Sequence, residues 1–179
     1  MTSNLRLLTA ASAAALLLTL AACTTAAPSV NDNNTVGAVS SACADSEGVT
    51  LSVDASALGD EDDVSGAWCV LTDEGVGAAD ALSIAAITTE GTEEYGDQVV
   101  CRVNNVPAAD LALTAEDGSD YFEQCESMPA AFAYWSLWVK PVGGEWDYAQ
   151  EGIATLQLEP GDAAELLFTL NGEPATPSS

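Results

Sequence analysis

Short apolar runs of strand length make up most of the chain after residue 42. Residues 48–54 (GVTLSVD) alternate apolar and polar side chains, and this period of two places Val49, Leu51 and Val53 on one face of a strand. Similar runs predict further strands at 67–71, 98–103, 134–139, 146–149, 153–158 and 164–170.

Only one segment has a helical periodicity. Within residues 75–91, Ala78, Leu82, Ala85 and Ala86 recur at a spacing that places them on one side of a short helix. One helix among about six or seven short strands predicts an α+β domain.

The first 22 residues have the pattern of a secretory signal peptide. Arg6 precedes an uncharged run of Leu and Ala, and small residues follow it. The run ends in Leu20-Ala21-Ala22-Cys23, which resembles the bacterial lipobox, where signal peptidase II cuts before a Cys that carries lipid. Two or more acyl chains on Cys23 would anchor the protein stably to the extracytoplasmic face of the cell membrane. The alternative is plain secretion after cleavage near Ala22.

Composition divides the rest of the chain into three parts. Residues 23–42 are small and polar without periodicity, which predicts a flexible tether. The domain follows at 43–170, with an irregular stretch at 107–129 that we expect to be a long connection. Residues 171–179 contain two Pro and no large apolar residue, so we expect a disordered tail there.

The mature chain is strongly acidic. Removal of residues 1–22 takes away Arg6 and no acid, leaving 3 − 1 = 2 basic residues against 28 acidic ones, a formal charge of 2 − 28 = −26. A surface of this sign repels nucleic acid and favours solubility, so nucleic acid is excluded as a partner. We interpret the acidity as a solvated coat.

Four cysteines remain if Cys23 is lipidated. An even number in an exported chain predicts two disulfides, and four cysteines allow three connectivities. The positions on either side of the central segment favour the sequential pairs Cys43–Cys69 and Cys101–Cys125. Each would close a loop worth about 3 kcal/mol in the chain-entropy model.

The residues needed for the common catalytic and metal sites are missing. The chain has no His and no CxxC motif, so neither a His-activated nucleophile nor a zinc site is predicted. The acidic residues 60–66 (DEDDVSG) fail the spacing of a calcium loop at Val64, and no pair stands out among the 28 acids as glycosidase carboxylates. We therefore expect a protein that is not an enzyme and holds no metal or cofactor.

The order of six stretches within residues 43–170 resembles that of a known family. They are residues 48–54 followed by Trp68-Cys69, then 79–82, 99–104, 134–138 and 158–162. The family comprises small bacterial surface lipoproteins with a domain like the C-terminal β domain of transcobalamin, several of them encoded beside energy-coupling-factor vitamin or metal transporters. The resemblance implies a β-grasp-like mixed or antiparallel sheet packed on a single helix and stapled by disulfides. It also implies a role in holding a ligand or partner.

Residues 133–152 hold three of the four Trp and two of the four Tyr. Gly143-Gly144 is a two-residue hairpin signal, which pairs Lys140 with Asp147 and Val139 with Tyr148. Faces alternate along paired strands, so the core side is predicted to hold Trp135, Leu137, Val139, Trp146 and Tyr148. A three-residue loop would reverse this assignment on one strand.

The opposite side of this hairpin holds the candidate binding residues Tyr134, Trp138 and Lys140, the only Lys of the chain. Exposed aromatic patches are uncommon without a use, so we expect these three to contact a ligand or partner. The alternative is burial beneath the connection at 107–129.

Two functions of different class follow. The first is a lipid-anchored binding or accessory module that delivers a small vitamin-like ligand to a membrane transporter subunit. The alternative is a structural or interaction module of the envelope with no small ligand. A hydrolase of wall polymers ranks last because no acidic pair stands out.

Overall fold

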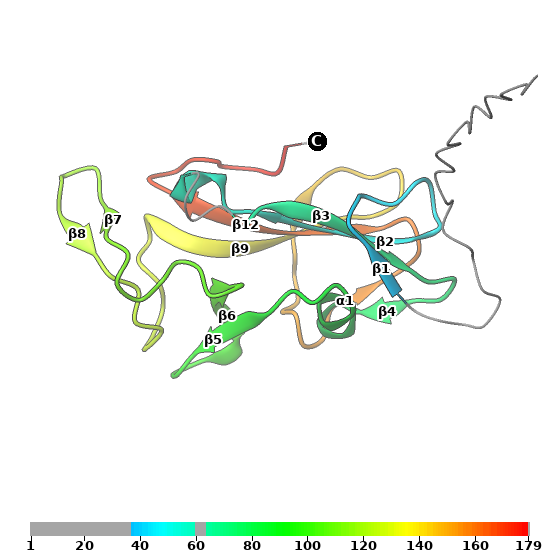
Figure 1. The fold of residues 1–179 in the computed structure, drawn as a ribbon, viewed down its shortest axis with the longest axis horizontal. Coiled ribbons are helices and arrows are strands. Elements are labelled where there is room, and N and C mark those ends of the chain that lie inside the picture. Colours follow the sequence, from blue (N-terminus) through cyan, green and yellow to red (C-terminus); the bar gives the residue numbers. More distant parts are fainter. Residues whose placement is uncertain (1–36, 60–63, 179) are drawn as a thin grey trace, which may run out of the picture. The chain divides into compact units, whose positions relative to one another are not determined.

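The computed structural model describes residues 37–59 and 64–178 (Figure 1). The predicted signal peptide, Cys23 and residues 24–36 of the predicted tether lie outside the described residues. In the part that is described, no helix is long and apolar enough to cross a membrane.

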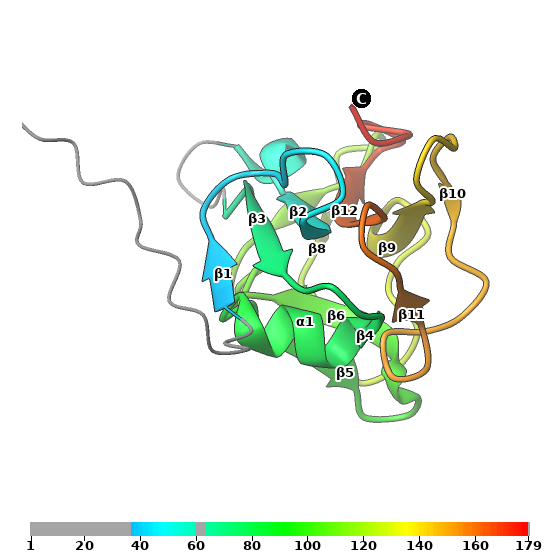
Figure 2. The same ribbon diagram turned by 90° about the vertical axis from the view of Figure 1, so that its right-hand side faces the viewer.

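The backbone of the domain is a six-stranded mixed sheet. Its strands, in spatial order, are β1 (Gly37–Val39), β3 (Gly66–Leu71), β2 (Gly48–Asp54), β12 (Ala163–Leu170), β9 (Ala133–Lys140) and β10 (Asp147–Tyr148). Strands β2 and β12 pair in parallel, and the other neighbours are antiparallel. The two longest central strands, β9 and β12, are paired along their whole length (Figures 1 and 2).

Smaller elements surround this sheet. Three two-stranded sheets are formed by β4 (Val76–Gly77) with β11 (Gln157–Leu158), β5 (Thr89–Thr92) with β6 (Gly96–Val103), and β7 (Leu113–Thr114) with β8 (Asp120–Tyr121). The only helices among the described residues are α1 (Ala78–Ile84) and the short 3₁₀ turn η1 (Ser56–Leu58).

The predicted α+β, β-grasp-like fold is wrong. Of the described residues, 41% lie in strands and only 7% are helical, and the strands are divided among several sheets. Helix α1 has seven residues and buries only Ala78, Ala81 and Leu82, so it presents too little apolar area to cover a six-stranded sheet alone. The segments around β4–β11 and β5–β6 also help to cover the central sheet. The domain is therefore mostly β, with one short helix inserted.

The core lies on one face of the central sheet, which we call the inner face. The alternation of residues 48–54 points Val49, Leu51 and Val53 to this side, where each is at most 3% exposed. Strands β9 and β12 contribute Trp135 and Phe168, whose rings meet edge to face at 5.2 Å. In Figure 1 α1, β4, β5 and β6 lie below the sheet, and residues of α1 and β6 belong to this same core.

Both predicted disulfides are confirmed, with the sequential pairing. Cys43–Cys69 ties the chain before β2 to β3, and Cys101–Cys125 ties β6 to the irregular stretch 107–129. In each disulfide one cysteine lies in a strand and the other in a segment without regular structure, so each link fixes an irregular segment to a strand.

The ends of the described region extend beyond the predicted domain limits of 43 and 170. Strand β1 lies inside the segment assigned to the tether and pairs with β3. At the other end, Asn171–Ser178 return along the outside of the sheet, above β12 in Figure 1. Thr169 Oγ1 donates to the carbonyl of Pro174 at 3.0 Å, which gives the predicted disordered tail a defined path.

Candidate functional site

The face of the central sheet that points away from the core, here called the outer face, carries the predicted binding residues. On β9 these outer positions are Tyr134, Ser136, Trp138 and Lys140. Their partners on β12 are Thr169, Leu167, Glu165 and Ala163. The outer face therefore mixes aromatic, charged and hydroxyl side chains, whereas the inner face is apolar.

The predicted register of the hairpin after β9 is wrong by one residue. Asp147 pairs with Val139, and Tyr148 pairs with Trp138, so an odd number of residues separates the paired positions. Gly144 N–H donates to the Pro141 carbonyl at 2.8 Å, which adds a tight turn before the returning chain. One residue of slip changes the face of every side chain on the second strand. Tyr148, predicted in the core, consequently lies on the outer face.

The slip brings aromatic and cationic groups together. The ring of Tyr148 stacks on Trp138 with centroids 3.9 Å apart, and the Trp138 indole N–H donates to Ser136 Oγ at 3.0 Å. The Nζ of Lys140 lies 5.7 Å from the centroid of the Trp146 ring, within cation–π range. Burial raises the pKa of the Tyr148 hydroxyl, and the nearby Tyr134 adds to the shift.

A cleft of about 460 Å³ opens beside this group, and we call it the outer-face cleft. Its lining comes from β9, from the loop before β10 and from the C-terminal segment: Trp138, Lys140, Gly144, Glu145, Trp146, Thr176 and Pro177. The indole Nε1 of Trp146 is buried and has no acceptor among residues 37–59 and 64–178. The cleft thus offers aromatic surfaces, one cation, one carboxylate and an unused hydrogen-bond donor.

A buried carboxyl group lies next to the cleft. Glu165 pairs with Trp138 across β12 and β9, is only 5% exposed, and its Oε1 has no partner in the described part of the chain. Burial raises the pKa of Glu165 to about 7, with a smaller contribution from the charge of Asp54. A neutral Glu165 avoids part of the cost of burying an unpaired charge.

The structure brings together two of the three predicted binding residues. Trp138 and Lys140 line the cleft, whereas Tyr134 lies farther along β9 and does not line it. Trp138 is only 5% exposed, so most of its ring is covered. Tyr148 stacks on one side of this ring.

Sequence reasoning missed three participants: Trp146, Glu165 and Pro177. Trp146 was assigned to the core by the register error. Glu165 had a signal, since it is the one charged residue in the apolar run 164–170. Pro177 lies eight residues beyond Thr169, and only the Asn171-Gly172 pair, a hairpin signal, indicated that the chain turns back.

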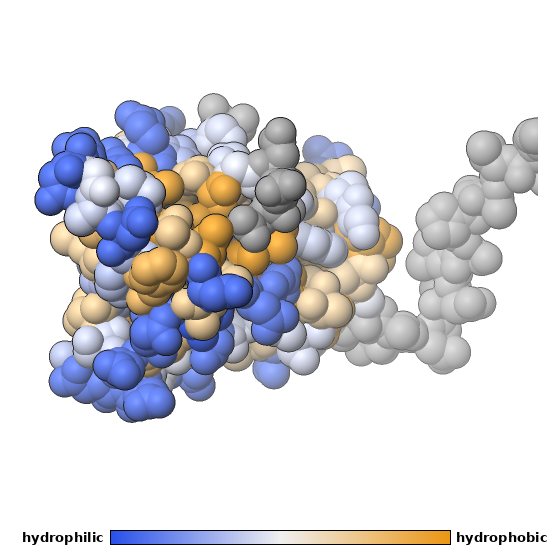
Figure 3. Space-filling model, turned by 60° about the vertical axis from the view of Figure 1, so that its left-hand side comes forward, coloured by the Kyte–Doolittle hydropathy of each residue, from blue (hydrophilic) through white to orange (hydrophobic). Residues whose placement is uncertain are grey.

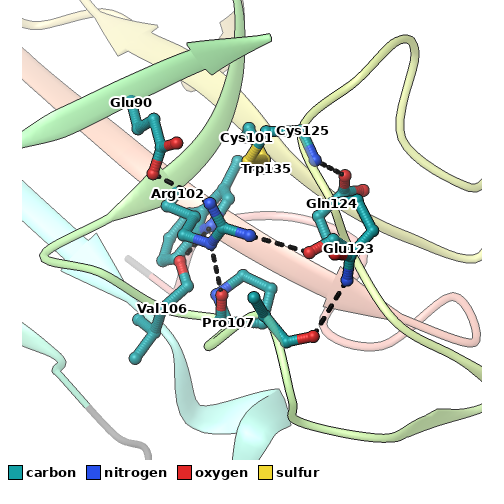
Figure 4. Close-up of polar contacts among 10 residues, drawn as sticks. Glu90, Cys101, Arg102, Val106, Pro107, Glu123, Gln124, Cys125 and Trp135 are labelled. Carbon is teal, nitrogen blue, oxygen red and sulfur yellow. Dashed lines mark hydrogen bonds and ion pairs between the residues drawn. A yellow bond between two sulfur atoms is a disulfide. The ribbon is translucent and has the colours of Figure 1, made fainter.

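Arg102, the only Arg outside the predicted signal peptide, organises a second polar cluster (Figure 4). Its guanidinium donates to the carbonyls of Pro107 and Glu123 at 2.8 and 2.7 Å and pairs with Glu90 at 2.9 Å. Trp135 Nε1 donates to the neighbouring Val106 carbonyl at 3.1 Å. These donors end on Glu90, on Val106 just before the irregular stretch, or on the backbone of that stretch, so the cluster fixes the stretch against the core.

Two other groups are weaker as sites. Cys101, Glu123 and Cys125 lie close enough to surround a metal ion, but both sulfurs are used in the disulfide and offer no thiolate. A cavity of about 340 Å³ beside α1 has a single charged residue in its lining, Asp97. The outer-face cleft is the richer site in aromatic and polar groups.

Comparisons with protein-family models, with curated proteins and with solved structures find no match to this chain. The function therefore has to be inferred from the residues of the domain.

Proposed function

We propose that the protein is a lipid-anchored extracytoplasmic binding or accessory lipoprotein whose binding site is the outer-face cleft. The observation that carries the proposal is the cleft itself, where Trp138 and Trp146 share a lining with Lys140, one of two basic residues left after residue 22. Concave sites with aromatic walls and a few polar groups are the usual form of a ligand pocket.

The chemistry of the cleft favours a ligand with a flat or apolar ring and an anionic or carbonyl group. The ring would lie on the indole of Trp146, its negative group would meet Lys140, and a carbonyl would accept from Trp146 Nε1. Many vitamins have this character. Association with a vitamin or metal transporter is the finer part of the proposal, and it rests on the family resemblance of the sequence.

Titration calorimetry with corrinoids, other vitamins and metal ions tests the cleft. We expect one ligand class to bind the wild-type protein and the Phe122→Ala variant, since Phe122 is an exposed aromatic residue outside the cleft lining. Binding should be lost in Trp146→Ala. No heat of binding across the whole panel, or equal binding by Trp146→Ala, would contradict the proposal.

The anchor is tested separately at Cys23. The lipobox interpretation predicts that cells fed radiolabelled palmitate incorporate label into the wild-type chain and not into Cys23→Ala. The wild-type protein should partition into detergent. Label that persists in Cys23→Ala, or wild-type protein without label, would refute anchoring at this residue.

An envelope interaction module is the second candidate function. Phe122 and Met128 are 45% and 59% exposed on the stretch that follows β7 and β8, and large exposed apolar side chains often mark protein contacts. Figure 3 views the domain from the side of β7 and β8, where hydrophobic surface lies among hydrophilic residues. A detergent pull-down separates the candidates: a stoichiometric partner lost in Phe122→Ala, without any small ligand, favours this module.

A further inference from the structure

We infer that the outer-face cleft recognises a small aromatic zwitterion, a molecule with one ring system, one carboxylate and one ammonium group, of which a free aromatic amino acid is the simplest example. Lys140 binds the carboxylate, Glu145 binds the ammonium group, and the ring lies against Trp146. The inference rests on the proposed role of the cleft as the binding site and names the class of its ligand.

Lys140 is a cation without an acidic partner in a chain that is rich in acids. The chain has 28 acidic residues and three basic ones. Among the described residues the single salt bridge joins Arg102 to Glu90, so no acid in that part of the chain pairs with Lys140. Its Nζ lies instead 5.7 Å from the centroid of the Trp146 ring. The ammonium group of Lys140 therefore remains available to an anionic group of a ligand in the cleft.

Glu145 brings a charge of opposite sign into the same lining. The loop that carries it is fixed to the turn before β12, because Val142 N–H donates to Asp162 Oδ1 at 2.9 Å. Glu145 and Lys140 both line the cleft, but they do not pair with each other, since the only salt bridge of the described part lies elsewhere. The cleft thus holds two opposite charges that a ligand with both signs of charge can satisfy together.

The walls of the cleft fit a single aromatic ring system. Trp138 and Trp146 line it, and Tyr148 holds Trp138 in place by stacking on it with ring centroids 3.9 Å apart. Thr176 and Pro177 complete the lining from the C-terminal segment, which lies near the loop between β9 and β10 in Figure 2. The volume of about 460 Å³ is in the range of small-ligand pockets. A ligand ring that lies against Trp146 would gain both apolar burial and an aromatic contact.

The charge of the whole chain decides between a zwitterion and a simple anion. A strongly acidic protein repels anions at long range, and Lys140 is the only cation in the lining. A zwitterion carries no net charge, so this repulsion does not oppose its approach. In the cleft it pairs with both Lys140 and Glu145. A molecule with a carboxylate alone leaves Glu145 unpaired, and a molecule with an ammonium group alone leaves Lys140 unpaired.

Titration calorimetry with three compounds that share one ring system tests the inference on the full-length protein in detergent. L-Tryptophan carries both charged groups, indole-3-propionate lacks the ammonium group, and tryptamine lacks the carboxylate. We expect L-tryptophan to bind at least about tenfold more tightly than either of the other two, because each missing group removes a hydrogen bond between charged partners.

Two variants assign each charge of the ligand to one residue. In Glu145→Gln the preference for L-tryptophan over indole-3-propionate should disappear, while its preference over tryptamine remains. In Lys140→Met the preference over tryptamine should disappear, while that over indole-3-propionate remains. Glu116→Gln is the matched control and should keep both preferences, because it removes the same charge at an exposed position outside the cleft lining. Each preference is a ratio measured within one protein, so a small loss of stability does not alter it.

Several results would overturn the inference. Equal binding of L-tryptophan and indole-3-propionate by the wild type would remove the role of the ammonium group, and equal binding of tryptamine would remove that of the carboxylate. Preferences that survive in Glu145→Gln and Lys140→Met, or that are also lost in Glu116→Gln, would contradict the assignment to these residues. If L-tryptophan, L-tyrosine and L-phenylalanine all fail to bind, the zwitterion class is refuted.

The outcome is separable from that of the proposed function. A compound without an ammonium group that binds the wild type and not Trp146→Ala, while the aromatic amino acids do not bind, would refute the inference and leave the proposed function standing. Binding of the amino acids that is lost in Trp146→Ala would support both. An absence of binding by every compound would refute both.

Discussion

The two faces of strands β9 and β12 are built from adjacent residues and have opposite character. On the inner face Trp135 meets Phe168 edge to face, and its indole N–H is satisfied by the Val106 carbonyl. On the outer face Trp138 stacks on Tyr148 beside Glu165, whose Oε1 has no partner among the described residues. Both tryptophans are almost fully buried, at 7% and 5% exposure.

Burial alone therefore does not separate a structural aromatic residue from a candidate binding residue. The difference lies in the polar groups around the ring. On the inner face the Trp135 indole N–H has a hydrogen-bond partner, as buried polar groups in native cores usually do. On the outer face a carboxyl oxygen of Glu165 and the Trp146 indole N–H have no partner among the described residues. The two buried polar groups without partners therefore distinguish the outer face from the inner one.

The largest expected effect is on the inner face. Trp135→Ala removes a buried ring and its hydrogen bond to Val106, so we expect the free energy of unfolding to fall by about 4 kcal/mol. Urea unfolding followed by circular dichroism measures this loss. Trp138→Ala is the matched variant, with an expected loss of about 2 kcal/mol because its ring borders a cleft that neighbouring side chains can fill. If both variants lose the same unfolding free energy, the two faces do not differ in how much their tryptophans stabilise the fold.

Glu165→Gln tests the outer face through its pH dependence. The carboxyl ionises at an ordinary pKa of 4.5 in the unfolded chain and at about 7 in the fold. Between these values the unfolded state binds fewer protons, so stability falls as the pH rises from about 4.5 to about 7, and it stays lower above. The ionisable neighbours on β2, β9 and β10 are Asp54, Tyr134, Lys140 and Tyr148.

Glutamine cannot ionise, so the stability of the variant does not fall between pH 4.5 and about 7. We expect Glu165→Gln to exceed the wild type by about 3 kcal/mol in unfolding free energy at pH 8 and to match it at pH 4. Glu145→Gln is the control, because Glu145 is an exposed cleft residue and should change neither value. A wild-type stability that is flat between pH 4 and 8 would contradict a buried, protonated Glu165.

The sequence predicts features that depend on neighbouring residues better than features that depend on distant ones. Alternation along a single strand correctly placed Val49, Leu51, Val53 and Trp135 in the core, because side-chain period is an intrinsic property of a strand. The disulfide pairing was also predicted from spacing. The pairing between strands was not, since the loop after Lys140 decides the register and a one-residue slip moved Tyr148 to the other face.

The fold class failed for a related reason. The helical spacing of Ala78, Leu82, Ala85 and Ala86 indicated a helix correctly. Its length and buried area, which decide the architecture, depend on the surrounding segments. The lining of the cleft includes Pro177, which lies there with Trp138 because the Asn171-Gly172 turn reverses the chain. Contacts between segments far apart in sequence leave little trace in a single sequence.

The stacked pair on the outer face gives a smaller effect. Tyr148→Ala removes the ring that covers Trp138, and we expect about 1 kcal/mol of lost stability, the size of an aromatic pair. Tyr95→Ala is the control, because Tyr95 is also exposed and lies on a turn outside this pair. Fluorescence quenching by acrylamide should increase in Tyr148→Ala alone. If quenching is unchanged, Trp138 is protected by other residues and the stack does not shape the cleft.

The smallest expected effect is at Lys140, and it separates stability from binding. Its Nζ lies 5.7 Å from the Trp146 ring at a partly exposed position, where a cation–π contact is worth about 0.5–1 kcal/mol. Lys140→Met keeps the aliphatic stem and removes the charge, so the unfolding free energy should change by less than about 1 kcal/mol. Binding of an anionic ligand in the cleft should nevertheless weaken about tenfold or more, because Lys140 is the only cation in the lining. Lys140→Arg keeps the charge and should retain binding. If Lys140→Met binds as well as the wild type, the charge on this face contributes to neither stability nor recognition, and only the aromatic walls distinguish the outer face from the inner one.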